Sequence, residues 1–251
     1  MTHHILIADH LSYSYPDGTP AVRDVSFEIH HGESVGIVGP NGAGKSTLVL
    51  LLNGFLEAIQ GSVTLGDRLL DKGSRDEFRR RIGVVFQNPD DQLFMPTVLD
   101  DVRFGPLNQG LTADAVTDRC RRAMERMHIA HLADRPPHHL SQGEKKAAAI
   151  AGVLAMDPDL LILDEPSAEL DPRSRREVIR FLHDYIHTRI VVSHDLDLVL
   201  ETCNRCLVMV NGAVVRDGNT DDILSDETFL EAHRLELPRS LRPVRRPGKA
   251  D

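Results

Sequence analysis

Two patterns of apolar residues alternate along this chain of 251 residues. Short runs that are apolar throughout, such as Leu160–Leu163, are typical of strands buried on both faces. Longer segments with an apolar residue every three or four positions, such as Ser174–Ile186, are typical of helices that cover such strands. Because the two kinds of segment alternate, the sequence predicts an α/β fold with a mostly parallel sheet and helices on its faces.

The same pattern gives approximate bounds for each element. Strands are predicted at Ile5–Ile7, Val22–Ile29, Val35–Val38, Ser62–Leu65, Ile82–Phe86, Leu160–Leu163, Ile190–Ser193, Leu207–Val210 and Ala213–Arg216. Helices are predicted at Ser46–Asn53, Leu99–Phe104, Ala113–Met127, Ser141–Met156, Ser174–Ile186, Leu196–Cys203 and Asp221–Leu235.

Three regions depart from the alternation. The first two strands are joined by the turn residues Pro16-Asp17-Gly18, which indicates an antiparallel β edge at the N-terminus. The section at about 88–140 contains predicted helices and no strand, so we expect a small helical subdomain inserted into the core. Residues 237–251 are rich in Pro and Arg without an apolar period, and we expect this tail to be disordered. One large domain is therefore expected over residues 1–236.

Charge and hydropathy limit the functions that the chain can have. The net charge of −9 and the pI of about 5.8 argue against a surface that binds nucleic acid phosphates. The longest apolar stretches, such as Ala147–Met156, have about half the length that a bilayer span needs. The first residues lack the basic and then apolar pattern of a secretory signal. We therefore expect a cytoplasmic protein that reaches a membrane through a partner.

Cysteine and histidine usage leaves one alternative open. The three cysteines, Cys120, Cys203 and Cys206, suit a reducing compartment, and we expect the last two to be ordinary semi-buried residues without zinc. Among thirteen histidines, His183 and His187 have the spacing of metal ligands on a helix. We expect exposed histidines without a metal role, the alternative being that the chain binds a metal itself.

The stretch Gly39–Thr47 carries the strongest chemical signal. Its pattern of Gly, four residues, Gly, Lys and Ser fits a phosphate-binding loop between a strand and a helix. Glycines let the backbone N–H groups curl around a phosphate, and the helix N-terminus adds partial positive charge. Lys45 can reach the β- and γ-phosphates, and the Ser46 hydroxyl can bind Mg²⁺. The predicted nucleotide contacts here are Gly39, Pro40, Asn41, Gly42, Ala43, Gly44, Lys45, Ser46 and Thr47.

Two carboxylates, Asp164 and Glu165, directly follow the apolar strand Leu160–Leu163. This position is the carboxyl edge of the sheet, where ligands bind in α/β folds. Asp164 can join the Mg²⁺ shell, and Glu165 can polarise a water for in-line attack on the γ-phosphate. A strand that merely runs into an acidic turn would look the same, but the phosphate-binding loop in the same chain favours hydrolysis.

Residues 140–144, Leu-Ser-Gln-Gly-Glu, form a second candidate anion site, because a hydroxyl, backbone N–H groups and a helix dipole face outward together. With these three motifs the chain resembles the ATPase subunits of ATP-binding cassette (ABC) transporters, over residues 1 to about 236. Their signature is Leu-Ser-Gly-Gly-Gln, so Gln142 and Glu144 are departures here. Ser141 and Gly143, the γ-phosphate contacts that the resemblance implies, are kept. Ala147 stands where the family usually has Arg.

The resemblance implies roles for further residues. Tyr15 would stack on the adenine of ATP, and Asp171 would lie in a loop that crosses to the opposite subunit. Gln87 and His194 would act with Glu165 as catalytic residues. Mg²⁺ would be bound by Ser46, Gln87 and Asp164. Because the signature motif (Ser141, Gln142, Gly143) of one chain completes the phosphate site of another, a homodimer is the simplest working unit.

Two stretches sharpen the resemblance. Residues 85–94 are similar to the glutamine loop of energy-coupling factor transporters, and residues 230–241 are similar to the C-terminal segment of their cobalt and nickel importers. These likenesses imply a peripheral ATPase on the cytoplasmic face of the cell membrane that works with integral membrane subunits. A vitamin importer is the alternative. A cassette ATPase of DNA repair, a two-cassette translation factor and a small-molecule phosphotransferase fit the chain less well.

Overall fold

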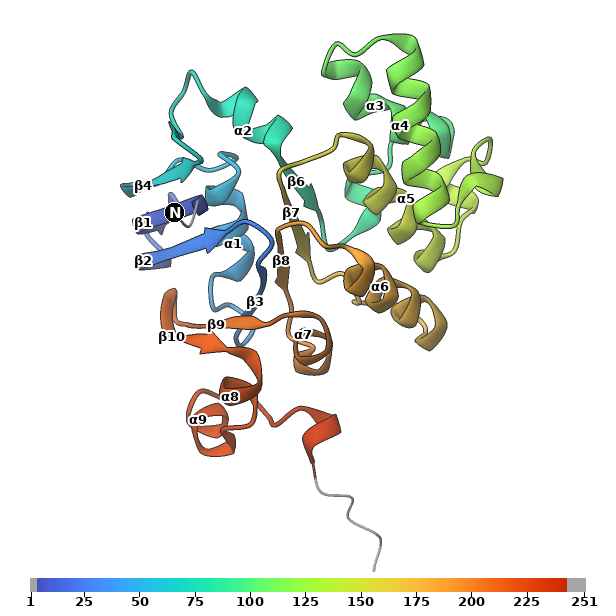
Figure 1. The fold of residues 1–251 in the computed structure, drawn as a ribbon. Coiled ribbons are helices and arrows are strands. Elements are labelled where there is room, and N and C mark those ends of the chain that lie inside the picture. Colours follow the sequence, from blue (N-terminus) through green and yellow to red (C-terminus); the bar gives the residue numbers. More distant parts are fainter. Residues whose placement is uncertain (1–3, 243–251) are drawn as a thin grey trace, which may run out of the picture.

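The computed structural model describes residues 4–242, and a six-stranded sheet forms its centre (Figure 1). The strand order is β10-β9-β3-β8-β7-β6. Neighbours from β9 to β6 pair in parallel, whereas β10 pairs antiparallel with β9. This confirms the predicted mostly parallel sheet. Its strands are β3 (Ser34–Val38), β6 (Ile82–Val85), β7 (Leu160–Asp164), β8 (Arg189–Val192), β9 (Arg205–Val210) and β10 (Ala213–Asn219).

Side chains of this sheet alternate between two apolar clusters. Leu160 and Ile162 of β7 pack in the cluster that contains α1, whereas Leu161 and Leu163 pack in the cluster that contains α5, α6 and α7. Because both faces of the strand are covered, both sets of positions must be apolar. These helices are α1 (Lys45–Leu52), α5 (Gln142–Ala155), α6 (Pro172–Asp184) and α7 (Leu196–Thr202).

A second, antiparallel sheet at the N-terminus has the order β2-β1-β4-β5. It confirms the predicted β edge and packs over α1 (Figure 1). The first strand is longer than predicted because it pairs with β2 on one side and β4 on the other, with irregular register near His10. The strands are β1 (His4–Ser14), β2 (Pro20–His30), β4 (Gln60–Leu65) and β5 (Arg68–Leu69).

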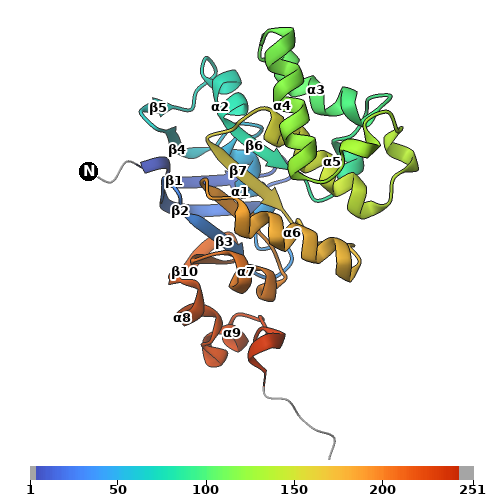
Figure 2. The same cartoon turned by 45° about the vertical axis from the view of Figure 1, so that its right-hand side comes forward.

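The helical subdomain lies beside the central sheet, on the side away from the N-terminal sheet (Figure 2). It has an apolar cluster of its own, to which α3, α4 and α5 contribute Val102, Cys120 and Ala151. This arrangement confirms the helical insertion. Its further elements are α3 (Val98–Asn108), α4 (Ala113–Arg126) and the short turns η1 (Pro89–Asp91), η2 (Ala130–Leu132) and η3 (Pro137–His139).

The fold differs from the predicted local structure at three places. The helix α2 (Arg75–Arg81) was not predicted, because Phe78 is its one buried residue. The helix predicted at Asp221–Leu235 is two helices, α8 (Thr220–Leu224) and α9 (Glu227–Ala232), since the Asp226 side chain caps the start of α9. Residues 237–242, expected to be disordered, include the turn η4 (Arg239–Leu241). The rest of the predicted tail, 243–251, lies outside the described residues.

Candidate active site

The phosphate-binding loop turns tightly between β3 and α1. Gly44 caps α1 with a φ of 97°, a left-handed conformation that favours glycine. A Cβ at this position would lie 2.1 Å from the carbonyl oxygen of Ala21. Glycine is therefore required here both by the backbone conformation and by the close approach of β2.

Lys45 begins α1 and is nearly buried, with 8% of its surface exposed. Its ammonium donates to the carbonyl oxygens of Gly39 at 2.8 Å and Pro40 at 3.2 Å. Burial lowers the pKa of Lys45, and the charges of Glu165 and Asp164 oppose that shift. The cation is thus held inside the loop by neutral acceptors, which the charged oxygens of a phosphate can replace.

Asp164 ends β7 and faces the same loop. Its Oδ1 is buried and has no hydrogen-bond partner among residues 4–242. Burial raises the pKa of Asp164, while a hydrogen bond from the Ser46 side chain lowers it. An unpaired carboxylate oxygen beside a hydroxyl is a set of hard oxygen donors, and these residues therefore fit Mg²⁺.

Glu165 and His194 are brought together at the ends of β7 and β8. Glu165 has a φ of 47°, and its side chain is buried. Its Oε1 accepts from the backbone N–H of His194 at 2.9 Å, and its Oε2 lies 2.8 Å from His194 Nδ1. Oε2 also accepts a hydrogen bond of 2.9 Å from the hydroxyl of Ser193, a residue that the sequence reasoning missed. The carboxylate is thus fixed by three groups of one loop.

A large cavity brings together five of the residues predicted for this site. It has a volume of about 1110 Å³, which is ample for a nucleotide. Residues from the phosphate-binding loop, the end of β6 and the end of β8 line it, among them Gly39, Pro40, Asn41, Gln87 and His194. The three segments come from distant parts of the sequence and meet because parallel strands end at one edge of the sheet.

Tyr15 lies next to the phosphate-binding loop. Its hydroxyl is 2.9 Å from Thr47 Oγ1, and its ring packs edge-on against Tyr13 with 5.3 Å between the centroids. Tyr15 is 39% exposed, so part of the residue is accessible to a ligand.

The signature residues lie elsewhere, at the start of α5. They do not line the cavity described above. A Cβ on Gly143 would meet the hydroxyl of Ser174 on α6 at 2.1 Å, so the two helices touch here. Asp171 caps α6 and accepts from the Ser174 hydroxyl at 2.6 Å. The structure therefore brings Gly143 and Asp171 near each other but not to the phosphate-binding loop of their own chain.

Two lysines that follow the signature motif were also missed. Lys146 is 1% exposed, and its ammonium donates to the carbonyl oxygens of Gln87 at 2.6 Å and Phe86 at 3.2 Å. Burial lowers the pKa of Lys146 to about 8. Lys145 forms an ion pair of 2.7 Å with Asp90. These contacts of Lys145 and Lys146 hold α5 against the loop that carries Gln87.

A signal for this arrangement is present in the sequence. Lys146 precedes Ile150 by four residues and Val153 by seven, so a helical period places the lysine on the buried face of α5. A lysine at a core position implies that nearby acceptors receive its ammonium.

The remaining candidate ligands do not cluster. Cys203 and Cys206 are free thiols, more buried than expected, and burial raises the pKa of both. Within residues 4–242, no three His, Cys, Asp or Glu side chains gather into a group that could hold a metal ion.

Comparison with known proteins decides the family. The model of the ABC transporter family matches residues 22–168. The chain belongs to the ABC transporter family. A protein of Geobacter sulfurreducens named as an ABC transporter ATP-binding protein is 52% identical over 241 residues, which cover 96% of this chain and 97% of that protein. The energy-coupling factor transporter ATP-binding protein EcfA of Methanothermobacter thermautotrophicus is 45% identical, over 92% of this chain and 76% of that protein.

Solved ABC structures agree with this membership. The structure of cbiO1 from Clostridium perfringens, described as part of the ABC transporter complex cbiONQ, has a TM-score of 0.81 and 39% identity, over 95% of this chain and 97% of that one. A dimeric ATP-binding cassette in a post-hydrolysis state with ADP and Pi has a TM-score of 0.76 and 25% identity, over 86% and 98%. This chain is an ABC transporter ATPase, which couples ATP hydrolysis to transport. Within the described part, none of the helices combines the length and apolar character that a membrane span needs.

Proposed function

We propose that this ATPase belongs to an importer of the energy-coupling factor type and powers the uptake of cobalt or nickel ions. The likeness to EcfA and to cbiO1, whose complex is named cbiONQ, supports the transporter type. The C-terminal segment at 230–241, similar to that of cobalt and nickel importers, supports the substrate.

An apolar groove carries the proposal that integral membrane subunits dock on this chain. The groove has a volume of about 380 Å³ and lies between β6, α3 and α5. Phe55, Phe94 and Phe104 line it although they are 52%, 64% and 43% exposed. Large exposed aromatic side chains around a hollow are typical of a protein interface. A helix from the cytoplasmic side of a membrane subunit is the occupant that we propose.

One loop contributes to both the groove and the nucleotide cavity. Phe86 and residues 91–94 line the groove, and Gln87, the residue after Phe86, lines the cavity. Lys145 and Lys146 fasten the same loop to α5. A displacement of the loop by a docked helix would therefore move Gln87 and α5 together, which is a physical route from ATP hydrolysis to transport.

The site residues take the following roles in the proposed reaction. The phosphate-binding loop and Lys45 bind and orient the β- and γ-phosphates. Ser46, Gln87 and Asp164 would hold Mg²⁺, which neutralises developing charge on the phosphate oxygens. Glu165 accepts a proton from the attacking water, and His194, bonded to Glu165, contacts the γ-phosphate.

Two copies of the chain form the proposed working unit. Ser141 and Gly143 do not reach the phosphate-binding loop of their own chain, so a second copy can supply them. A similar solved structure is described as a dimeric cassette bound to ADP and Pi, which supports a dimer of this chain. Asp171, beside Gly143, would lie in the same interface.

Uptake into proteoliposomes tests the proposal. The chain is purified with its membrane subunits, and accumulation of radiolabelled Co²⁺, Ni²⁺ and a vitamin such as riboflavin is measured with internal or external ATP. We expect ATP-dependent uptake of Co²⁺ or Ni²⁺, and no uptake when Lys45→Ala replaces the native chain. Uptake of the vitamin alone would identify the alternative importer and overturn the proposed substrate.

A further inference from the structure

The signature serine is already engaged inside its own chain. The Ser141 hydroxyl and the Ser141 backbone N–H both donate to Glu144 Oε2, each at a distance of 2.8 Å. In return, Ser141 Oγ accepts from the backbone N–H of Glu144 at 3.3 Å. These bonds form a complete capping box at the start of α5. The hydroxyl proposed for the γ-phosphate of a partner's ATP thus faces a carboxylate.

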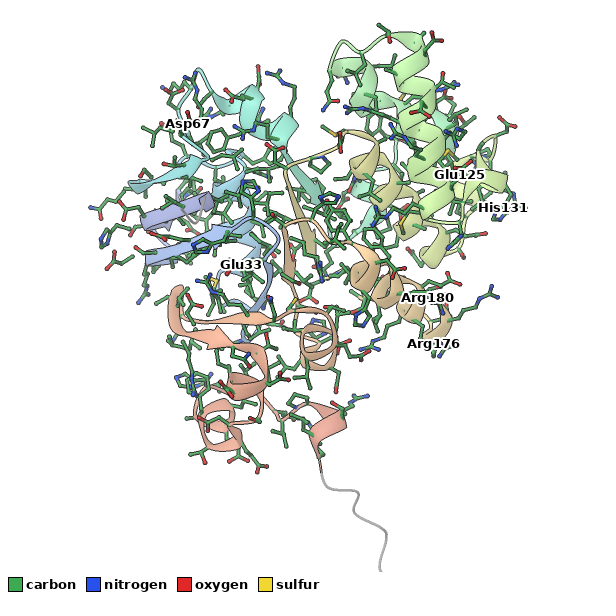
Figure 3. The ribbon with its side chains drawn as sticks, viewed as in Figure 1. Glu33, Asp67, Glu125, His131, Arg176 and Arg180 are labelled. Atoms are coloured by element: carbon green, nitrogen blue, oxygen red, sulfur yellow. The ribbon has the colours of Figure 1, made fainter. Side chains whose placement is uncertain are left out.

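That carboxylate is negatively charged at neutral pH. Hydrogen bonds from the backbone N–H and hydroxyl of Ser141 lower the pKa of Glu144, and the charges of Arg135 and His131 act in the same direction. His131 lies on the outer side of the helical subdomain (Figure 3). The N-terminus of α5 also stabilises an anion. The Glu144 carboxylate of the chain itself therefore occupies the position at which the sequence predicts the γ-phosphate of a bound ATP.

We propose that Glu144 sets the ATP concentration at which two copies of this chain close around nucleotide. The inference rests on the proposed function, in which Ser141 of one copy meets the γ-phosphate bound by the other. For this contact the hydroxyl must leave Glu144 Oε2, and the carboxylate must come close to a polyphosphate. Both steps disfavour closure. Glu144 is in this sense a positioning residue that raises the ATP requirement of the dimer.

One substitution separates the charge of Glu144 from its structural role. In Glu144→Gln the side-chain oxygen can still accept from the Ser141 N–H, and Gln serves a capping box as well as Glu does. The repulsion of the γ-phosphate is lost. In Glu144→Ala the bonds from the Ser141 N–H and hydroxyl to the side chain of residue 144 are lost as well, so the melting temperature falls. We expect Glu144→Gln to keep the melting temperature of the parent chain.

The test measures dimer formation of the full chain by sedimentation velocity during an ATP titration with Mg²⁺. All proteins carry Glu165→Gln, which is expected to preserve ATP. Adding Glu144→Gln should lower the ATP concentration at the midpoint of dimerisation about tenfold, as expected for one like-charge contact removed near a protein surface. The control adds Glu231→Gln, which removes an exposed carboxylate of α9, and should leave the midpoint unchanged.

A kinetic readout distinguishes positioning from simple stability. With Glu165 restored, Glu144→Gln should lower the KM for ATP about tenfold and change kcat by less than about twofold. A midpoint and KM equal to or above those of the parent chain would overturn the inference and leave the proposed function standing. If the Glu165→Gln protein forms no dimer at any ATP concentration, the proposed dimer fails, and the inference fails with it.

Discussion

Glu165 Oε2 lies 2.8 Å from His194 Nδ1, although 29 residues separate the two along the chain. The contact exists because β7 and β8 are parallel neighbours and end at the same edge of the sheet. The side chain of Glu165 is buried, while that of His194 is 61% exposed. The pair thus links a fixed carboxylate to a ring that can reach a ligand in the cavity.

Replacing Lys45 should remove nucleotide binding. The Lys45 ammonium donates hydrogen bonds to the carbonyl oxygens of Gly39 and Pro40, inside the loop. Lys45→Ala should abolish ATP binding or hydrolysis and leave the fold intact, since the side chain bonds to neutral acceptors only. Fluorescent ATP analogue binding and circular dichroism measure the two effects. Normal ATP turnover by this variant would refute the assignment of the phosphate-binding loop.

Gly44→Ala should destabilise the loop. Gly44 combines a φ of 97° with a Cβ position only 2.1 Å from the carbonyl oxygen of Ala21. Gly18→Ala is a matched control, because Gly18 has a φ of 86° but no atom within 4 Å of a Cβ. We expect Gly18→Ala to cost about 1–2 kcal/mol in free energy of unfolding and Gly44→Ala clearly more. Urea denaturation measures both values. If the two variants lose the same free energy of unfolding, the close approach of Ala21 to Gly44 does not contribute to the loss.

Lys146→Met should weaken the connection between α5 and the loop of Gln87. Methionine keeps most of the volume but leaves the carbonyl oxygens of Phe86 and Gln87 without the ammonium donor. We expect a reduced kcat, by about tenfold, and at most about 3 kcal/mol lower stability. Lys145→Met is the control. It removes an ion pair whose Asp90 side chain is 50% exposed, so that water can solvate the carboxylate left behind, and it should lower kcat and stability less than Lys146→Met does. Equal kcat values for the two variants would contradict the positioning role.

The docking groove and the tail should differ in their effect on membrane association. Replacing Asp90 and Phe94 with Ala should release the chain from membranes that contain its partner subunits, because Phe94 is a 64% exposed side chain of the groove. Basal hydrolysis should survive. Deletion of residues 242–251 should leave association and hydrolysis largely intact, since its few cations add about 1 kcal/mol each near an anionic leaflet. Sedimentation of membrane vesicles separates the two variants, and the reverse pattern would show that docking is misplaced.

The sequence predicts those features whose chemistry is local. The phosphate-binding loop and the carboxylates after Leu160–Leu163 can be recognised because a few adjacent residues create them. Contacts between distant segments are harder. The bond from Lys146 to Gln87 depends on how α5 packs against the end of β6. The helix α2 escapes prediction because a single buried residue, Phe78, gives no period.

Of two further features that were missed, one was visible in the sequence and the other was not. Ser141 followed three residues later by Glu144 is the pattern of a capping box, which the family signature obscured. The order of residues 237–242 had no local signal, because it comes from Asp197 on α7. Its carboxylate accepts from the backbone N–H groups of Arg239 and Ser240, each at 3.0 Å.

The central claim is that Glu165 activates the water that hydrolyses ATP between two copies of this chain. Glu165→Gln keeps size and shape but removes the base, so turnover should fall by roughly 10²–10⁴-fold while ATP stays bound. The most direct measurement is sedimentation velocity of this variant with and without ATP and Mg²⁺, together with its rate of phosphate release. The account predicts a stable dimer only with ATP and almost no phosphate release. A monomer at saturating ATP with unchanged phosphate release would contradict it.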